Sequence, residues 1–400
     1  MPDRQDHLTF RGNLKSTRYG WLRLTPAYSV HLVRDLLVHA STDTFVLDPF
    51  CGTGTTALVC AERGVACQTS DINPFLLWLA STKSRPYSEA QLRESAELHR
   101  LVEASFVDPE AARWLPPLSN IEKWWAPQTL LSLSRGIARV RSLEHSAAPE
   151  ALDLVKVSFC RALIACANVS FSHQSMSFTR STTVADAREP TPLFRAATLN
   201  VLESARSPIA ATPRVARCDA RSADACFEPD SFTQVITSPP YPNRMSYVRE
   251  LRPYLYFLGY LSDAPSAGDL DWSAIGGTWG SATSRLARWR PAADDDVPYP
   301  DFTSLIGQIQ ERSPVLARYV HKYFCDMNRH IRSLTPLLKK HGSVHYIVGN
   351  SKFYEVMVPV ERIFAALFEA SGLTDARVAQ IRKRTSKKEL FEFVVSARRA

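Results

Sequence analysis

The segment Thr237-Ser238-Pro239-Pro240-Tyr241 carries residue types suited to chemistry on the amino group of a nucleic acid base. Such an amine is a poor nucleophile because its lone pair is delocalised into the ring. The Ser238 hydroxyl and the Pro239 carbonyl can accept hydrogen bonds from both amine hydrogens, which favours a pyramidal nitrogen with a free lone pair. Prolines lack a donor N–H and have a fixed φ, so they hold such a turn rigidly. The ring of Tyr241, rather than its hydroxyl, offers a face on which an extruded base can stack. The alternative is a proline-rich turn with a structural role alone.

A second candidate site lies at 48–56, directly after the apolar run 45–47. Gly52 and Gly54 permit a tight turn and a close approach of the backbone to a ligand. Asp48 ends the first predicted strand, where it can accept a hydrogen bond from an ammonium group or a loop amide. Asp71 ends the next strand, about twenty residues after the glycines, where it can bind ribose hydroxyls. The turn lacks a third glycine and a Gly-Lys-Ser/Thr ending, so it favours an adenosine-type cofactor over a triphosphate or dinucleotide. A bare strand-to-helix turn is the alternative.

The stretch 48–55 resembles the Asp-Pro-Phe-x-Gly-x-Gly-Thr motif of amino-group DNA methyltransferases. The resemblance implies that the cofactor is S-adenosylmethionine, that this turn carries its methionine part, and that the aromatic residue lines the cofactor pocket. The residues of this sequence that match the motif, and that we expect to bind the cofactor, are Asp48, Phe50, Cys51, Gly52, Gly54 and Thr55.

Three further positions match the cofactor site of the same family. Asp71 corresponds to the acid that binds the ribose, and Asp219 to the acid that contacts the adenine amino group. Residues 24–29, which include Pro26, resemble the N-terminal segment that closes over the methionine end of the cofactor. An amphipathic helix in this region explains much of that last match.

The resemblance also bears on the target base. Ser-Pro-Pro-Tyr at 238–241 is typical of enzymes that methylate N4 of cytosine, whereas Asp or Asn at the first position is commoner in N6-adenine enzymes. We therefore expect direct in-line methylation of cytosine N4 after base flipping, with adenine N6 as the first alternative. Asn243 and Arg244 follow the motif and are expected to touch the flipped nucleotide or its phosphate; the start of a helix explains them equally well. The cofactor motif precedes the catalytic motif, which excludes the class with the reverse order.

The formal net charge of +8 and the pI near 9.1 agree with a polyanionic partner. With the resemblance, they imply double-stranded DNA as substrate. Methylation of RNA or of a protein amide is the second alternative, and a binding module without catalysis is the third. The sequence shows neither a membrane span nor a signal peptide, which predicts a cytoplasmic protein without membrane contact. Nothing resembles a nuclease, so a restriction endonuclease partner would be a separate chain. The oligomeric state is left open.

The hydrophobic patterns predict an α/β fold with a Rossmann-like sheet of the class I methyltransferase type. The expected strands are 45–47, 64–71, 214–217, 232–237 and 342–348, followed by a helix at 358–371 and a hairpin formed by 376–381 and 390–396. We assign 1–87, 214–261 and 315–400 to the catalytic domain, 88–213 to a mainly helical insertion, and 262–314 to a candidate segment for target recognition. Within that last segment, 262–300 is expected to be irregular.

Three segments have compositions that suit DNA contact. Residues 262–300 combine tryptophans with arginines, unless the tryptophans pack on the core. Residues 170–180 in the insertion are the rival. Basic residues in the turn of the last hairpin are expected to contact phosphates if the hairpin faces DNA, and to be solvated otherwise. The residues concerned are Trp272, Trp279, Trp289, Arg285, Arg288 and Arg290 in the first segment, and Arg382, Lys383, Arg384, Lys387 and Lys388 in the hairpin.

The eight cysteines are scattered, and several fall within apolar runs. The sequence contains no Cys-x-x-Cys pair. This pattern favours inert buried thiols over a zinc site or a disulfide framework.

Overall fold

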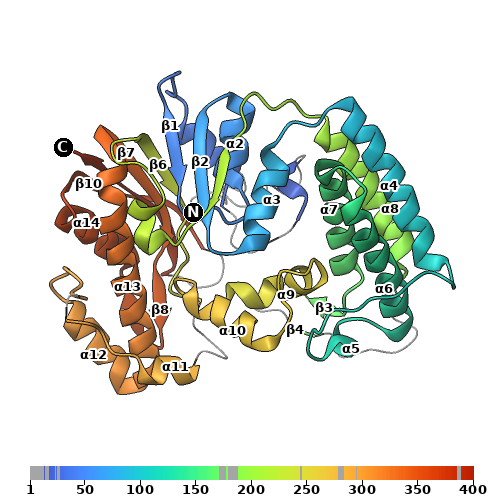
Figure 1. Ribbon diagram of the computed structural model, residues 1–400. Helices are drawn as coiled ribbons and strands as arrows, with labels where there is room; N and C mark the ends of the chain where they lie inside the picture. Colours follow the sequence, from blue (N-terminus) through green and yellow to red (C-terminus); the bar gives the residue numbers. More distant parts are fainter. Residues whose placement is uncertain are drawn as a thin grey trace.

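The computed structural model describes residues 13, 18–22, 24, 28–170, 177–178, 188–243, 246–277, 283–293, 295–384 and 389–400. A seven-stranded sheet in the order β10-β11-β7-β6-β1-β2-β5 runs through it (Figure 1). The strands from β7 to β5 pair in parallel, and β11 is antiparallel to both of its neighbours. The α/β class and the Rossmann-like sheet are thereby confirmed. The strands are β1 (Phe45–Asp48), β2 (Ala66–Asp71), β5 (Arg214–Arg217), β6 (Phe232–Thr237), β7 (Leu338–Gly349), β10 (Leu373–Lys383) and β11 (Phe391–Arg399).

The order of the strands reverses between β1 and β6. From β1 the chain adds β2 and then β5 on one side, whereas β6 and β7 lie on the other side. In open α/β sheets a ligand binds outside the carboxyl ends of the strands at such a reversal, because the connections leave in opposite directions and open a crevice there. The residues that end β1 and β6 are therefore the ones that can meet a ligand.

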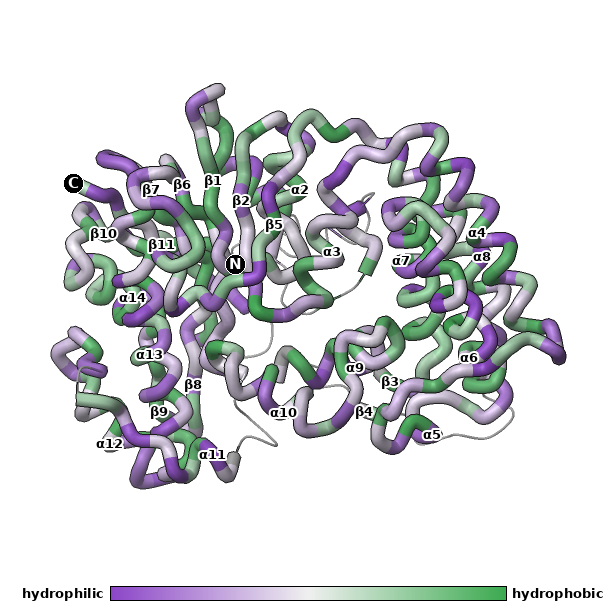
Figure 2. The backbone as a smooth tube through the Cα atoms, viewed as in Figure 1, coloured by the Kyte–Doolittle hydropathy of each residue, from purple (hydrophilic) through white to green (hydrophobic). Residues whose placement is uncertain are grey.

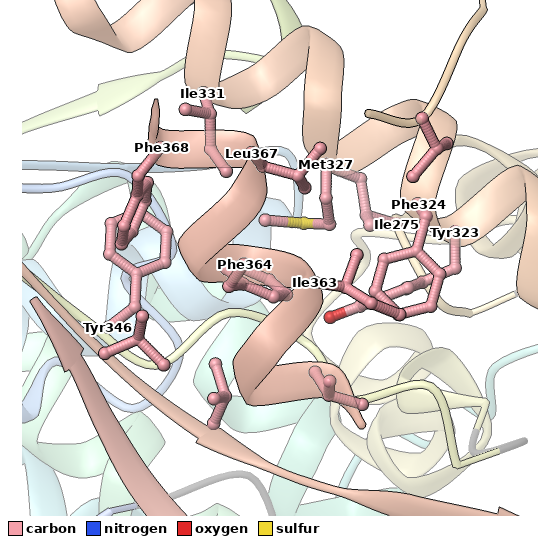
Figure 3. Close-up of a cluster of buried hydrophobic side chains, with 14 of the residues drawn as sticks. Ile275, Tyr323, Phe324, Met327, Ile331, Tyr346, Ile363, Phe364, Leu367 and Phe368 are labelled. Atoms are coloured by element: carbon pink, nitrogen blue, oxygen red, sulfur yellow. The ribbon is translucent and has the colours of Figure 1, made fainter. Parts of the chain in front are cut away.

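Helices cover both faces of the sheet because neighbouring residues of each central strand point to opposite faces. Val46, Ile236 and Ile347 pack with α1 and α2 on one face. Their neighbours Leu47 and Tyr346 pack with α13 and α14 on the other, where Phe364 and Phe368 surround Tyr346 (Figure 3). The covering helices are α1 (Val30–Leu36), α2 (Thr55–Arg63), α13 (Pro314–Leu334) and α14 (Val360–Ala370).

Residues 88–213 are mainly helical, as expected, and build a core of their own. The helices alternate between hydrophilic and hydrophobic residues, as helices with one buried face do (Figure 2). Among the described residues, no helix is long and apolar enough to cross a bilayer. The domain boundaries themselves stay predictions. The elements of this region are α4 (Glu89–Val107), α5 (Ile121–Trp124), α6 (Pro127–Ser142), η4 (Leu143–His145), α7 (Pro149–Ala165), β3 (Val169–Ser170), β4 (Ser177–Phe178) and α8 (Pro190–Ala205).

The helix after the candidate catalytic turn, α9 (Tyr247–Phe257), joins the core of the insertion rather than that of the sheet. Leu251 and Leu255 are buried there. The Tyr254 ring stacks on the Phe75 ring of α3 (Pro74–Ser84), with centroids 5.0 Å apart. The helix that follows the candidate catalytic turn in the sequence therefore packs on the insertion.

The prediction that 262–300 is irregular is wrong for 264–273 and 283–288, which form α10 (Ala264–Ser273) and α11 (Thr283–Arg288). The helix α12 (Phe302–Arg312) follows them. Asp263 caps α10 by accepting a hydrogen bond from the amide of Ser266 at 2.7 Å. The polar residues that suggested a loop thus serve as a helix start. Trp272 and Trp289 pack against the core of the sheet. Trp279 lies outside the described residues, as do most of 170–180 and both Lys387 and Lys388.

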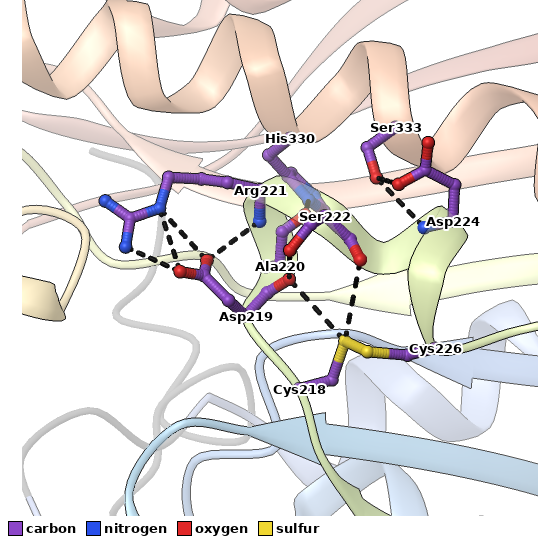
Figure 4. The surroundings of a disulfide bond; sticks show 9 residues. All are labelled: Cys218, Asp219, Ala220, Arg221, Ser222, Asp224, Cys226, His330 and Ser333. Carbon is purple, nitrogen blue, oxygen red and sulfur yellow. Dashed lines mark hydrogen bonds and ion pairs between the residues drawn. A yellow bond between two sulfur atoms is a disulfide. The ribbon is translucent and has the colours of Figure 1, made fainter.

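One pair of cysteines departs from the expectation of free thiols. Cys218 and Cys226 form a disulfide, and their Cα atoms are 6.3 Å apart (Figure 4). The short 3₁₀ helix η6 (Ala220–Ala225) between them turns the chain back on itself, which brings together residues whose spacing carries no motif. The other six cysteines are free and buried, as predicted.

Arg18 joins the start and the end of the helical insertion to the sheet region. Its guanidinium is 1% exposed and donates to the carbonyls of Lys83 and Arg85, at the end of α3. It also donates to the carbonyls of Ser204, Ala205 and Ser207, at the end of α8, and the five distances run from 2.5 to 3.3 Å. The last carbonyls of a helix have no partner within it and attract a positive charge. One side chain therefore caps two helices that lie far apart in the sequence.

We expect Arg18→Ala to lower the free energy of unfolding by about 3 kcal/mol or more, because each buried carbonyl left without a donor costs about 1–3 kcal/mol. Urea denaturation followed by circular dichroism would measure the change. Arg34→Ala is the matched control, since the Arg34 side chain is 45% exposed in its pair with Glu62 and should contribute less than about 1 kcal/mol. Equal effects of the two substitutions would contradict the capping role of Arg18.

Candidate active site

The predicted site segments meet at one edge of the sheet. Asp48 and Asp71 are the last residues of β1 and β2, Asp219 follows β5 by two residues, and Ser238 comes directly after β6. These four strands are parallel neighbours, so their carboxyl ends lie at the same edge. The site therefore occupies the reversal between β1 and β6 and extends toward β5.

The glycine turn holds two helices in close contact. Gly52 and Gly54 have φ values of 50° and 75°, in the left-handed region that glycine adopts without strain. A β-carbon on Gly54 would lie 2.9 Å from both the Cα and the Cβ of Ala80 in α3. Gly54 is also the residue before α2, where Thr55 begins the helix. The second glycine thus sets the packing of α2 on α3, and with it the shape of the turn.

Asp71 connects the glycine turn to the next helix. Its Oδ2 accepts a hydrogen bond from the amide of Gly52 at 3.2 Å, and its Oδ1 accepts one from the amide of Asn73 at 2.9 Å. Burial raises the pKa of Asp71 to about 6, although these amides favour the charged form. The carboxyl group is therefore placed beside the turn and titrates close to neutral pH.

Asp48 lies under the turn and is fully buried. Its Oδ1 accepts hydrogen bonds from the Thr237 hydroxyl at 2.6 Å and from the amide of Phe50 at 3.1 Å, so its observed partners include a loop amide, one of the two donors expected. Burial raises its pKa to about 7, against the effect of these donors. Tyr28, within the segment predicted to close over the cofactor, bonds to Thr56 and lies 3.5 Å from Asp48 Oδ2. Pro26 lies outside the described residues.

Asp219 is held by an arginine that the sequence reasoning did not identify. The Arg221 guanidinium binds both oxygens of Asp219, with Nη2 to Oδ2 at 2.6 Å (Figure 4). It also contacts Asp326 Oδ1 at 3.3 Å. Partial burial favours the neutral acid, but the hydrogen bonds of Arg221 outweigh it and lower the pKa of Asp219. The Asp219 side chain keeps 37% of its surface exposed, so it can still accept a ligand donor.

Phe50 is supported by a neutral histidine. The two rings meet edge to face, with the centroid of His330 4.8 Å away. Burial lowers the pKa of His330 to about 4, and its ring nitrogens lie 2.7 Å from the Ala220 carbonyl and the Tyr346 hydroxyl. This arrangement fixes the Phe50 ring at the rim of the site, beside Asp219 and its neighbours.

The proline-rich turn presents acceptors. The Ser238 hydroxyl donates to the carbonyl of Ile347 at 3.1 Å, which commits its hydrogen and leaves the oxygen able to accept. The Tyr323 hydroxyl donates to the carbonyl of Pro240 at 2.8 Å and so anchors the turn to α13. Within the part of the chain that the structure describes, no group donates to the Pro239 carbonyl. The Ser238 side chain also interacts with the Tyr241 hydroxyl, so its oxygen lies between the Ile347 carbonyl and the tyrosine.

Tyr241 has a hydrogen-bonding partner that the sequence argument did not include. Its hydroxyl donates to Glu392 Oε1 at 3.1 Å, and the Arg384 guanidinium lies 5.5 Å from the centre of its ring. Two of the basic residues expected at phosphates, Arg382 and Arg384, therefore bind protein groups, while Lys383 is exposed. The Asn243 amide donates to the Tyr241 carbonyl at 2.8 Å, and Arg244 lies outside the described residues.

Lys83 is a second residue that the sequence reasoning missed. Its ammonium group is buried beneath the glycine turn and donates to the carbonyls of Thr53 at 3.1 Å and Tyr19 at 3.3 Å. Burial lowers its pKa to about 7. A lysine on a predicted helix is ordinarily a solvated residue, so no local signal in the sequence could have identified it.

Comparison with known proteins gives a local similarity. No model of a known protein family matches the chain. A segment of 69 residues is 30% identical to the Type II methyltransferase M.AvaI of Nostoc sp. and to that of Anabaena variabilis. The match spans 17% of this chain and 14% of the length of either relative. Two structures of the rRNA methyltransferase aviRa from Streptomyces viridochromogenes align with 94% and 97% of this chain and with 87% and 92% of theirs, at 12% identity and TM-scores of 0.28 and 0.30.

We expect Gly54→Ala to reduce stability by more than the roughly 1 kcal/mol of strain at a left-handed position, because its β-carbon would clash with Ala80. Thermal unfolding of the purified variants would measure the effect. Gly64→Ala is the matched control: Gly64 has φ +70°, but a β-carbon there meets only the Ala210 side chain at 3.5 Å. If the two variants lost the same stability, the close approach of α2 and α3 would not be limiting.

Proposed function

We propose that this protein is an S-adenosylmethionine-dependent methyltransferase that acts on DNA and transfers a methyl group to the N4 amine of cytosine. The observation that carries the proposal is the hydrogen bond between Thr237 and Asp48, which joins the proline-rich turn at the end of β6 to the glycine turn at the end of β1. The hydrogen-bond acceptors proposed for the base amine thereby lie next to a turn suited to an adenosine-type cofactor. The local similarity to a Type II methyltransferase supports the same reading.

The residues at the carboxyl ends of the strands fit such a cofactor. Asp71 stands beside Gly52 at the place expected for ribose hydroxyls, and Asp219 and Phe50 lie further along the edge for the adenine ring. Gly52, without a side chain and with positive φ, leaves the approach to the backbone open. The cofactor supplies a sulfonium-bound methyl group as the electrophile. The protein has to hold the amine in line with it.

The proline-rich turn would bind and shape that amine. The Ser238 oxygen accepts one amine hydrogen, because its own hydrogen is committed to Ile347, and the Pro239 carbonyl accepts the other. Both bonds strengthen as the nitrogen becomes pyramidal and its charge develops, so they stabilise the transition state more than the ground state. With the cofactor bound, the amine lone pair would take the methyl group as its bond to sulfur breaks, and the surplus proton on nitrogen would leave to solvent.

A methyl-transfer assay with duplex DNA, RNA and protein as acceptors tests the proposal. We expect label only in DNA, and N4-methylcytosine after digestion to nucleosides. Detection of N6-methyladenine would support methylation of a base amine but contradict cytosine as the target base. Transfer only to RNA or to protein would contradict DNA as the substrate. A restriction endonuclease as a separate partner and a cytoplasmic location stay predictions.

Ser238→Ala should lower the single-turnover rate of methylation about a hundredfold, because losing one transition-state hydrogen bond typically costs about 3 kcal/mol. The affinity for S-adenosylmethionine should stay near that of the wild type, since Ser238 contacts Ile347 and not the glycine turn. Rapid-quench kinetics and calorimetry would measure the two quantities. A variant with full rate would exclude Ser238 as the amine acceptor.

Cofactor affinity should rise with pH through about 6, the pKa of Asp71. Ribose hydroxyls donate more strongly to the carboxylate than to the protonated acid, so the charged form is the binding form. The association constant at pH 5 should then be about a tenth of that at pH 8, the factor set by titration one unit below the pKa. Calorimetry across this range would test it, with Asp71→Asn as the control that should remove this dependence. An unchanged pH profile in Asp71→Asn would assign the titration to another group, such as Asp48.

A further inference from the structure

The ring of Tyr241 lies against a row of residues that crosses three strands. Arg382 of β10 pairs with Glu392 of β11, and Glu392 pairs in turn with Gly349 of β7. Residues directly opposite one another in a sheet point to the same face. The row therefore places the Arg382 guanidinium, the Glu392 carboxylate and Gly349, which has no side chain, next to one another. It lies at the edge of the sheet where the proline-rich turn lies.

Gly349 makes room for the tyrosine. A β-carbon at this position would lie 3.1 Å from Cε2 and 3.3 Å from Cδ2 of Tyr241, and 2.8 Å from Nη1 of Arg384. A side chain at this position would therefore require both the Tyr241 ring and the Arg384 guanidinium to shift. The glycine on β7 thus allows the two side chains to lie where they do.

Glu392 then fixes the far end of the ring. Its Oε1 accepts the Tyr241 hydroxyl at 3.1 Å, and its Oε2 accepts Nε of Arg382 at 2.6 Å. The residue is 8% exposed, so removing either donor would leave a buried charge with less compensation. Burial, together with the neighbouring Glu392, raises the pKa of Tyr241 well above its usual value, which keeps the hydroxyl protonated and donating.

Arg384 holds the ring from another side. Its Nη1 donates to the carbonyl of Asn350 at 3.1 Å, and its guanidinium packs over the ring of Tyr241. An arginine over a tyrosine ring adds a cation–π attraction. The tyrosine is thereby confined by Glu392 of β11, by Arg384 directly after β10 and by the glycine that ends β7.

From these contacts we propose that Glu392 is a positioning residue: it acts through Tyr241 and holds the ring in the orientation in which an extruded target base stacks. The inference rests on the proposed function, because it assigns Glu392 to the same turn. Glu392 touches neither the base nor the cofactor in this scheme. Its effect reaches the reaction only through the tyrosine hydroxyl.

A double-mutant cycle on the full-length protein tests the assignment. Tyr241→Phe should lower kcat/KM for unmodified bacterial genomic DNA about fivefold, and Glu392→Ala about tenfold, the range expected for one lost intramolecular hydrogen bond. The double variant should be no worse than Glu392→Ala alone, because both changes break the same contact. Glu392→Gln keeps an acceptor for the tyrosine and should recover most of the activity.

Glu389→Ala is the matched control on the same hairpin, since Glu389 pairs with Lys352 at the surface and should leave activity unchanged. Calorimetry with S-adenosylmethionine should give the wild-type dissociation constant for every variant. If the losses in kcat/KM multiplied to about fiftyfold in the double variant, the role of Glu392 would be overturned. It would also be overturned if Glu392→Gln were as defective as Glu392→Ala, or if the variants bound the cofactor more weakly. A wild-type protein that binds the cofactor but methylates no DNA would instead overturn the proposed function, and this assignment with it.

Discussion

The site depends on one buried carboxylate. Asp48 ends β1, is fully buried, and accepts hydrogen bonds from Thr237 at the end of β6 and from the amide of Phe50 in the glycine turn. A buried acid of this kind is stable only where donors surround it, so the two turns are held in one geometry. Because β1 and β6 flank the reversal of strand order, this interaction sets the distance between the proposed cofactor turn and the proposed catalytic turn.

The helical insertion is tied to this centre at two places. Arg18 caps the ends of α3 and α8 together, which fixes where the insertion leaves the sheet region and where it returns. The second connection is α9, which begins six residues after Tyr241 and whose apolar side packs in the core of the insertion.

The C-terminal hairpin of β10 and β11 supports the site from the end of the sheet that lies opposite β5. Its residues Arg382, Arg384 and Glu392 face Tyr241 or its partners, and Gly349 on the adjacent strand leaves space for the ring. Two of the basic residues that the sequence suggested as phosphate contacts, Arg382 and Arg384, thus form ion pairs, hydrogen bonds and ring contacts within the protein. Among the described residues of this basic group, only Lys383 is exposed.

The sequence by itself determined the features that depend on neighbours in the chain. The strand ending at Asp48, the left-handed glycines of the turn and the acceptors at 238–241 follow from residue types at short spacing, because backbone conformation is a local property. The same reasoning failed for part of 262–300, where Asp263 and the polar residues near it start a helix instead of a loop.

Tertiary structure alone decided the contacts between distant segments. Tyr241 and Glu392 are 151 positions apart, and Arg18 reaches carbonyls 186 to 189 positions away. The disulfide joins Cys218 to Cys226 only because η6 turns the chain back between them. A buried glutamate, arginine or lysine looks like any solvated charge in a sequence, since its cost and its compensation both arise from partners that the fold supplies.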